Sequence, residues 1–137
     1  IDKNMDSLDI NFTYIGRLPE GFSFKNTNYL PPMEMDSISK ELESADIYLT
    51  ASLEEAGANH VLEALAVGLP VVYHSGGGSI VEYCQNYGIS FSSFDEMKNS
   101  IKSISSDYNS YRNKITEYNR SVDDVVEEYL DILCSQR

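Results

Sequence analysis

The chain has 137 residues, which is enough for one domain with its own hydrophobic core. Hydrophobic residues make up 42% and charged residues 23%, the ordinary composition of a globular protein. Ten Lys and Arg against 22 Asp and Glu give a formal net charge of −12, which argues against a long basic surface for nucleic acid or anionic lipid.

The first two thirds of the sequence alternate short β-type runs with helical patterns, which is typical of a parallel sheet. Strands are expected over five short segments: 12–15, 27–30, 46–50, 70–73 and 88–91. Helices are expected between the later strands, one capped by Asp36 and two others at about 57–67 and 79–86. The sequence therefore predicts an α/β fold, a Rossmann-like parallel sheet with helices on both faces.

After the last strand the pattern is helical only. Apolar residues recur at three- and four-residue spacing, first in Phe94, Met97, Ile101 and Ile104 and then in Tyr108, Tyr111, Ile115 and Tyr118. A last helix is expected from Ser121, with Asp124 placed for a capping box. We expect a C-terminal helical segment in which the tyrosines serve packing.

The helix expected at about 57–67 carries the most informative polar residues. Its buried face should consist of Ala58, Val61, Leu62, Leu65 and Ala66. Asn59 and Glu63, four residues apart, then project together on another side. Because this helix follows a strand, Glu55 and the amides of 57–59 should lie beyond the carboxyl ends of the parallel strands, where open α/β sheets bind ligands.

The beginning of this helix has the chemistry of a phosphate site. Unpaired N–H groups and the helix dipole attract anions even in an acidic protein. Gly57, with Ala56 and Ala58 beside it, would let a ligand approach the backbone closely. Glu63 could accept two hydrogen bonds from a diol such as a ribose.

Glu55, seven intervening residues and Glu63 are followed by Ala-Leu-Ala-Val-Gly-Leu-Pro-Val-Val and then by Ser-Gly-Gly-Gly with Glu82. This stretch resembles the donor-binding, C-terminal domain of retaining group 1 glycosyltransferases of the two-Rossmann-domain (GT-B) type. The resemblance covers roughly 12–91 and is strongest over 45–82. It implies transfer of a hexosyl group from a nucleotide-diphosphate sugar to a glycan or lipid-linked acceptor, as in polysaccharide biosynthesis.

The resemblance also implies roles for single residues. Glu55 would contact the donor sugar near the reacting carbon and is the catalytic candidate. Glu63 would bind the nucleoside ribose. Other donor-binding residues would be those of the phosphate loop, the base-stacking segment within 30–33 and the glycine loop: Ala56, Gly57, Ala58, Asn59, Pro32, Met33, Gly76 and Gly77. No metal and no cofactor is implied, since the nucleotide sugar is a substrate.

Two departures from the family pattern bear on these roles. Family members often carry Gly-Phe-Gly or Gly-Phe-Pro after the first glutamate, where this chain has 56–59, so the sugar pocket is expected to differ. The basic residues that neutralise the diphosphate have only Arg17 and Lys25 as nearby candidates. We expect 1–137 to be a single nucleotide-sugar-binding domain that lacks its first β-α unit and the upstream acceptor domain, and to be inactive alone.

Several alternatives stay open. A sugar-nucleotide epimerase or phosphorylase fragment would share the fold, and a degenerate interaction domain would share the sequence pattern.

Other polar residues are given no role in the site. We interpret His60 and His74 as structural or peripheral and Glu54 and Glu82 as surface residues. We expect Cys84 and Cys134 to be free thiols.

No apolar run approaches the roughly 20 residues that span a bilayer. The expected location is the cytoplasm, with peripheral contact at the inner membrane face only through the missing domain. Expected partners are the nucleotide sugar and the acceptor, and not nucleic acid.

Overall fold

The computed structural model describes residues 2, 8–116, 127 and 134. Within these residues the strands are β1 Thr13–Ile15, β2 Asn28–Leu30, β3 Tyr48–Thr50, β4 Val71–His74 and β5 Gly88–Phe91. The helices are α1 Met35–Glu43, α2 Asn59–Ala66, α3 Ser79–Cys84, α4 Phe94–Ser106 and α5 Tyr108–Ile115. The predicted elements up to α5 are therefore confirmed, whereas Tyr118 and the helix expected from Ser121 lie outside the described residues.

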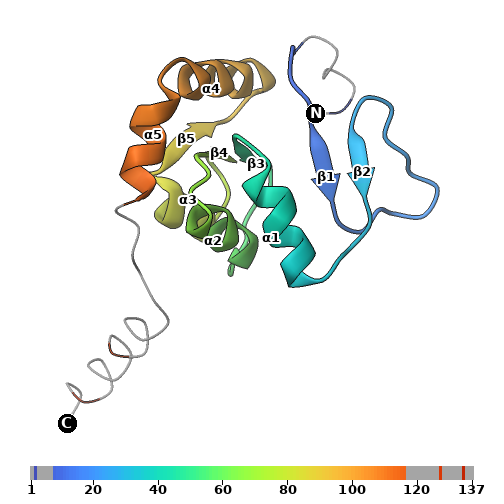
Figure 1. The fold of residues 1–137 in the computed structure, drawn as a ribbon, viewed down its shortest axis with the longest axis horizontal. Helices are drawn as coiled ribbons and strands as arrows, with labels where there is room; N and C mark the ends of the chain where they lie inside the picture. The colour runs from blue at the N-terminus through green and yellow to red at the C-terminus, as the bar shows by residue number, and fades with distance from the viewer. Residues whose placement is uncertain (1, 3–7, 117–126, 128–133, 135–137) are drawn as a thin grey trace.

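All strand pairs are parallel, as predicted, but they form two groups. Strands β3, β4 and β5 make one sheet in that order, with Tyr48 opposite Val71 and Val71 opposite Gly88. Strands β1 and β2 make a second sheet, with Thr13 opposite Asn28. Figure 1 shows β1 and β2 side by side at one end of the molecule, apart from β3, β4 and β5.

Helices cover both faces of the three-stranded sheet, as expected. Val71 and Tyr73 of β4 pack in one buried cluster with residues of α2 and α3. Val72, between them, packs on the other face with Met97 and Ile104 of α4. This alternation follows from the period of two in a strand, and it places β4 at the centre of the core.

The buried face of α2 is turned relative to the one that the sequence pattern predicts. Ala58, Val61 and Leu65 are buried as expected, but Ala66 is exposed and Ala64 is fully buried. Ala64 packs beside the helix that precedes it in the chain, in a cluster with Leu42 of α1 and Leu69. Because α2 contacts α1 as well as the sheet, its apolar face is turned toward Ala64.

The predicted cap of α1 is also wrong. Glu34 precedes the helix without a side-chain cap, and Asp36 lies within the first turn. There the negative charge of Asp36 interacts favourably with the positive end of the helix dipole. This explains why an acidic residue is found at the start of this helix although it does not cap it. Among the described helices, none combines the length and apolarity needed to cross a membrane.

Candidate functional site

Two loops meet at the carboxyl ends of β3 and β4. The loop after β3 leads into α2, and the loop after β4 leads into α3. The Glu54 amide donates to the Gly76 carbonyl at 2.9 Å, and the Ser79 amide donates to the Glu55 carbonyl at 2.9 Å. The Ser79 hydroxyl also donates to the Glu55 carbonyl, at 3.0 Å. These bonds fix the backbone at Glu55 against the start of α3.

Gly78 allows this close approach. Its φ is +65°, and a Cβ at this position would lie 2.5 Å from the Glu55 carbonyl oxygen. The amides of Gly76 and Gly77 already have partners, the His74 Nδ1 and the His74 carbonyl, each at 3.0 Å. The roles predicted for Gly76 and Gly77 in a phosphate pocket therefore stay predictions, and any such role would depend on shape and not on their amides.

A polar chain of three side chains joins β3, the loop and α2. His60, in the first turn of α2, lies 3.2 Å through Nε2 from both carboxylate oxygens of Glu55. Its other ring nitrogen, Nδ1, lies 2.9 Å from the Tyr48 hydroxyl oxygen. The hydrogen bonds from His60 and then from Ser52 hold the pKa of Glu55 below the usual glutamate value. Glu55 is therefore ionised, and its carboxylate is hydrogen-bonded to a residue of α2.

Glu63 lies one turn further along α2 and reaches the same region. It is half-buried and lines a groove together with His60 and Tyr48. Burial raises the pKa of the Tyr48 hydroxyl, and the negative charges of Glu63 and then Glu55 raise it further. Both carboxylates thus lie near enough to Tyr48 to raise the pKa of its hydroxyl, but of the two only Glu63 lines the groove.

The beginning of α2 leaves backbone donors unpaired. Its N-cap, Ala58, supplies no side-chain hydrogen bond, and Asn59 is exposed. To the described part of the chain, the amides of 56, 57 and 59 donate no hydrogen bond. A Cβ on Gly57 would meet open space, whereas Ala58 is buried as a whole residue, backbone included. The donor-binding role predicted for Ala58 stays a prediction.

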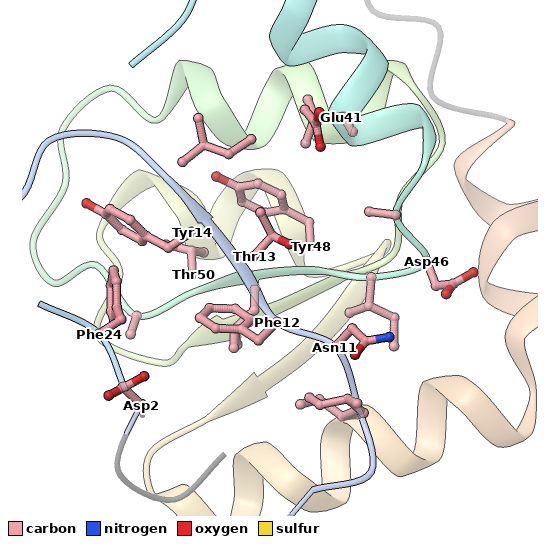
Figure 2. Close-up of a pocket in the computed structure, with 18 of the residues that line it drawn as sticks. Asp2, Asn11, Phe12, Thr13, Tyr14, Phe24, Glu41, Asp46, Tyr48 and Thr50 are labelled. Carbon is pink, nitrogen blue, oxygen red and sulfur yellow. The ribbon is translucent and has the colours of Figure 1, made fainter. Parts of the chain in front are cut away.

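A groove with a volume of about 1510 Å³ lies between β1 and β3, and residues 56–59 are not among those that line it. Figure 2 shows Phe12 and Tyr14 from the β1 side, and Tyr48 and Thr50 of β3, among the residues around it. Glu63, His60 and Ser52 line it as well, but Glu55, Pro32 and Met33 do not. The structure therefore leaves the predicted base-stacking residues away from the groove that Glu63 lines.

The basic residues considered for phosphate binding lie on the loop between β1 and β2. Arg17 and Lys25 are both exposed, and Lys25 lines the groove while Arg17 does not. Among the described residues, no group of three or more His, Cys, Asp or Glu side chains has the arrangement of a metal site.

Residues 24–122 match the family model described as Glycosyl transferases group 1. The chain belongs to this family. The matched range contains both loops, all of α2 and both glutamates, and the family transfers glycosyl groups from a sugar donor to an acceptor. A search of curated proteins and a search of solved structures each gave no match.

The sequence did not indicate the link between His60 and Glu55. The two residues are five positions apart, and the loop between them is not helical, so no helix or strand period predicts their contact. The interpretation of His60 as structural or peripheral did not include this link, and His74, interpreted in the same way, fits a structural role through its bond to Gly76 and its edge-on contact with Phe91. The only available signal was an imidazole and a carboxylate flanking one short loop.

Proposed function

We propose that this chain is the donor-binding half of a retaining group 1 glycosyltransferase with two Rossmann-type domains. The donor is a nucleotide-diphosphate sugar, and a hexosyl group goes to a glycan or lipid-linked acceptor. The observation that carries the proposal is the unpaired amino-terminal edge of α2, with Glu55 and Glu63 on either side of it.

Each part of this edge has a role in the proposal. The unpaired amides of 56, 57 and 59 bind the sugar and the distal phosphate, since a helix start holds anions through N–H groups and its dipole. Glu55 accepts hydrogen bonds from sugar hydroxyls near the anomeric carbon, and Glu63 accepts them from the ribose diol. The main contribution to catalysis is orientation of the donor and stabilisation of the leaving diphosphate.

Donor binding by the full-length protein tests the proposal. Calorimetry with UDP, GDP and ADP sugars should find one donor class. Glu63→Gln should then weaken binding about tenfold, the order expected for one charge-assisted hydrogen bond. Glu82→Gln is the matched control, because Glu82 is exposed on α3 and should bind like the wild type.

The rival functions give different results in the same system. Absence of binding to every nucleotide sugar would favour a non-catalytic interaction domain. If a donor binds, the identity of the product separates transfer, which gives a glycosylated acceptor, from epimerisation, which gives an epimeric sugar, and from phosphorolysis, which gives a sugar 1-phosphate. The anomeric configuration of the glycosylated acceptor then tests retention.

We also propose that another parallel strand of the same polypeptide, outside 1–137, completes the sheet between β1 and β3. The backbone directions support this. The Asn28 amide donates to the Phe12 carbonyl and the Gly16 amide to the Leu30 carbonyl, so 12 and 16 turn toward β2. The backbone groups of Thr13 and Ile15 therefore turn the other way, toward the groove.

Strand β3 presents a matching edge. The Tyr48 amide donates to the Pro70 carbonyl beside β4, so the backbone groups of Ile47 and Leu49 turn toward the groove. In Figure 2 the labels run in the same direction from Asn11 to Tyr14 and from Asp46 to Thr50. A groove of about 1510 Å³ exceeds the roughly 300 to 1,000 Å³ of a typical ligand pocket. An extended strand would pair both free edges at once.

Hydrogen exchange tests this completion of the sheet. In a longer protein that includes the preceding segment, the amides of Thr13, Ile15, Ile47 and Leu49 should exchange at least about a hundredfold more slowly than in 1–137. The amide of Val72 in the central strand serves as the internal reference. Unchanged exchange at all four edge amides would refute the added strand.

A further inference from the structure

His60 has no part in donor binding as described above, yet its ring carries two hydrogen-bonding contacts. The ring nitrogens contact a carboxylate on the loop after β3 and a hydroxyl on β3 itself. The side chain is 34% exposed, so burial in the core does not hold it. Polar contacts therefore account for its position.

These contacts define the protonation pattern of the neutral ring. An ionised carboxylate can only accept, so the Nε2 that lies 3.2 Å from both Glu55 oxygens carries the proton and donates. Nδ1 then accepts from the Tyr48 hydroxyl at 2.9 Å. Tyr48 is a suitable donor, because its buried position beside two carboxylates keeps its proton in place.

The His60 N–H, shared by both oxygens, and the hydrogen bond from Ser52 leave part of the Glu55 carboxylate available. A carboxylate has about four lone-pair positions, and the His60 proton uses the space between the two oxygens. The remaining positions can accept sugar hydroxyls. The contact therefore fixes the orientation of Glu55 without blocking it.

We propose that His60, oriented by Tyr48, is a positioning residue that holds the Glu55 carboxylate in the orientation used for the donor sugar. This inference rests on the proposed function, because it assigns a partner to the glutamate of that site. The hydrogen bonds from the Ser79 amide and hydroxyl to the Glu55 carbonyl hold the main chain, and His60 holds the side chain. Loop and helix together define where the carboxylate lies.

The test compares variants of the full-length enzyme with its own donor and acceptor. His60→Gln retains an N–H that can reach Glu55, His60→Phe retains a ring without a donor, and Tyr48→Phe removes the group that orients the imidazole. We expect His60→Phe to lower kcat/KM about tenfold, Tyr48→Phe to lower it severalfold, and His60→Gln to stay within about threefold of the wild type.

The pH profile separates positioning from a merely structural role. Loss of the His60 hydrogen bond raises the pKa of Glu55 toward its usual value, so the acidic limb of kcat/KM should move to higher pH in His60→Phe but not in His60→Gln. Tyr48 and Glu63, the other titratable groups at this position, stay in place in both variants. Nitrogen NMR of the imidazole should show the Nε2-protonated tautomer in the wild type and a mixture in Tyr48→Phe.

Two results would refute the inference: equal kcat/KM and pH limbs in His60→Phe and His60→Gln, or an Nδ1-protonated ring in the wild type. Failure of the proposed function gives a different result, since Glu55→Gln would then leave donor turnover unchanged. If Glu55→Gln abolishes turnover while His60→Phe behaves as the wild type, the donor role of Glu55 stands and only the positioning role falls.

Discussion

Gly78 is the residue on which the contact between the two loops depends. A side chain there would meet the Glu55 carbonyl at 2.5 Å and would also have to adopt a φ of +65°. The left-handed conformation alone costs an L-residue roughly 1–2 kcal/mol, and a clash with backbone cannot be relieved by a rotamer change. The geometry around Glu55 therefore depends on the last residue of the glycine loop.

Gly78→Ala should lower the free energy of unfolding by at least about 2 kcal/mol, measured by urea denaturation. Gly57→Ala is the matched control, because a Cβ there meets nothing within 4 Å, and it should change stability by less than about 0.5 kcal/mol. Equal losses in the two variants would contradict the assigned role of Gly78.

The two cysteines differ in reactivity because only one is accessible. Burial of Cys84 raises the pKa of its thiol to about 12, whereas Cys134 is exposed. The thiolate is the reacting form, so at pH 8 a disulfide reagent such as DTNB should label one thiol rapidly in the native protein and two in denaturant. Cys134→Ser should remove the rapid phase. A rapid phase that persists in that variant would show that Cys84 is accessible.

At the scale of single elements, α2 and α4 begin in different ways. The Ser93 hydroxyl of α4 accepts from the Glu96 amide, and the Glu96 carboxylate accepts from the amide and hydroxyl of Ser92. The start of α2 has no side-chain cap. A side-chain cap stabilises a helix by pairing one of its first amides, so the start of α4 is stabilised in this way and the start of α2 is not.

Paired substitutions should show this difference in thermal or urea unfolding. Ser93→Ala removes a cap and should cost about 1 kcal/mol. Asn59→Ala should change stability by less than about 0.5 kcal/mol, because Asn59 is the first helical residue and caps nothing. A loss of 1 kcal/mol or more in Asn59→Ala would mean that its side chain caps α2 in solution.

The sequence predicts the helices and strands better than it predicts which of them pack together. Periodicity located α2, two of its three buried residues and its buried N-cap residue, because that pattern is local. It missed Ala64, whose burial depends on Leu42 of α1, a contact between separate helices. The same limit explains why Glu55 and Glu63 could be selected from their spacing and resemblance, whereas His60, which links the first of them to β3, could not.

At the scale of the whole molecule, the two sheets differ in how firmly they are held. Every described residue that is buried lies at Leu42 or beyond, in the part of the chain that carries β3, β4 and β5. Strands β1 and β2 are instead joined by their ladder and by a group of aromatic rings that includes Tyr14, Phe24 and Tyr29. The sequence predicted parallel strands throughout but not this separation, because strand pairing depends on residues far apart in the chain.

The chain 1–137 should therefore open in two steps. Amide exchange of Gly16 and Asn28, which pair β1 with β2, should report a lower opening free energy than that of Val71 in β4. Phe24→Ala should lower the opening free energy at Gly16 and Asn28 further, because the Phe24 ring lies 5.2 Å from the Tyr14 ring and 6.3 Å from the Tyr29 ring. The opening free energy at Val71 should stay unchanged. A single opening free energy for all three amides, shifted together by Phe24→Ala, would show that the sheets unfold as one unit. In a protein whose sheet is completed between β1 and β3, the two steps should merge, because the added strand would pair with both edges.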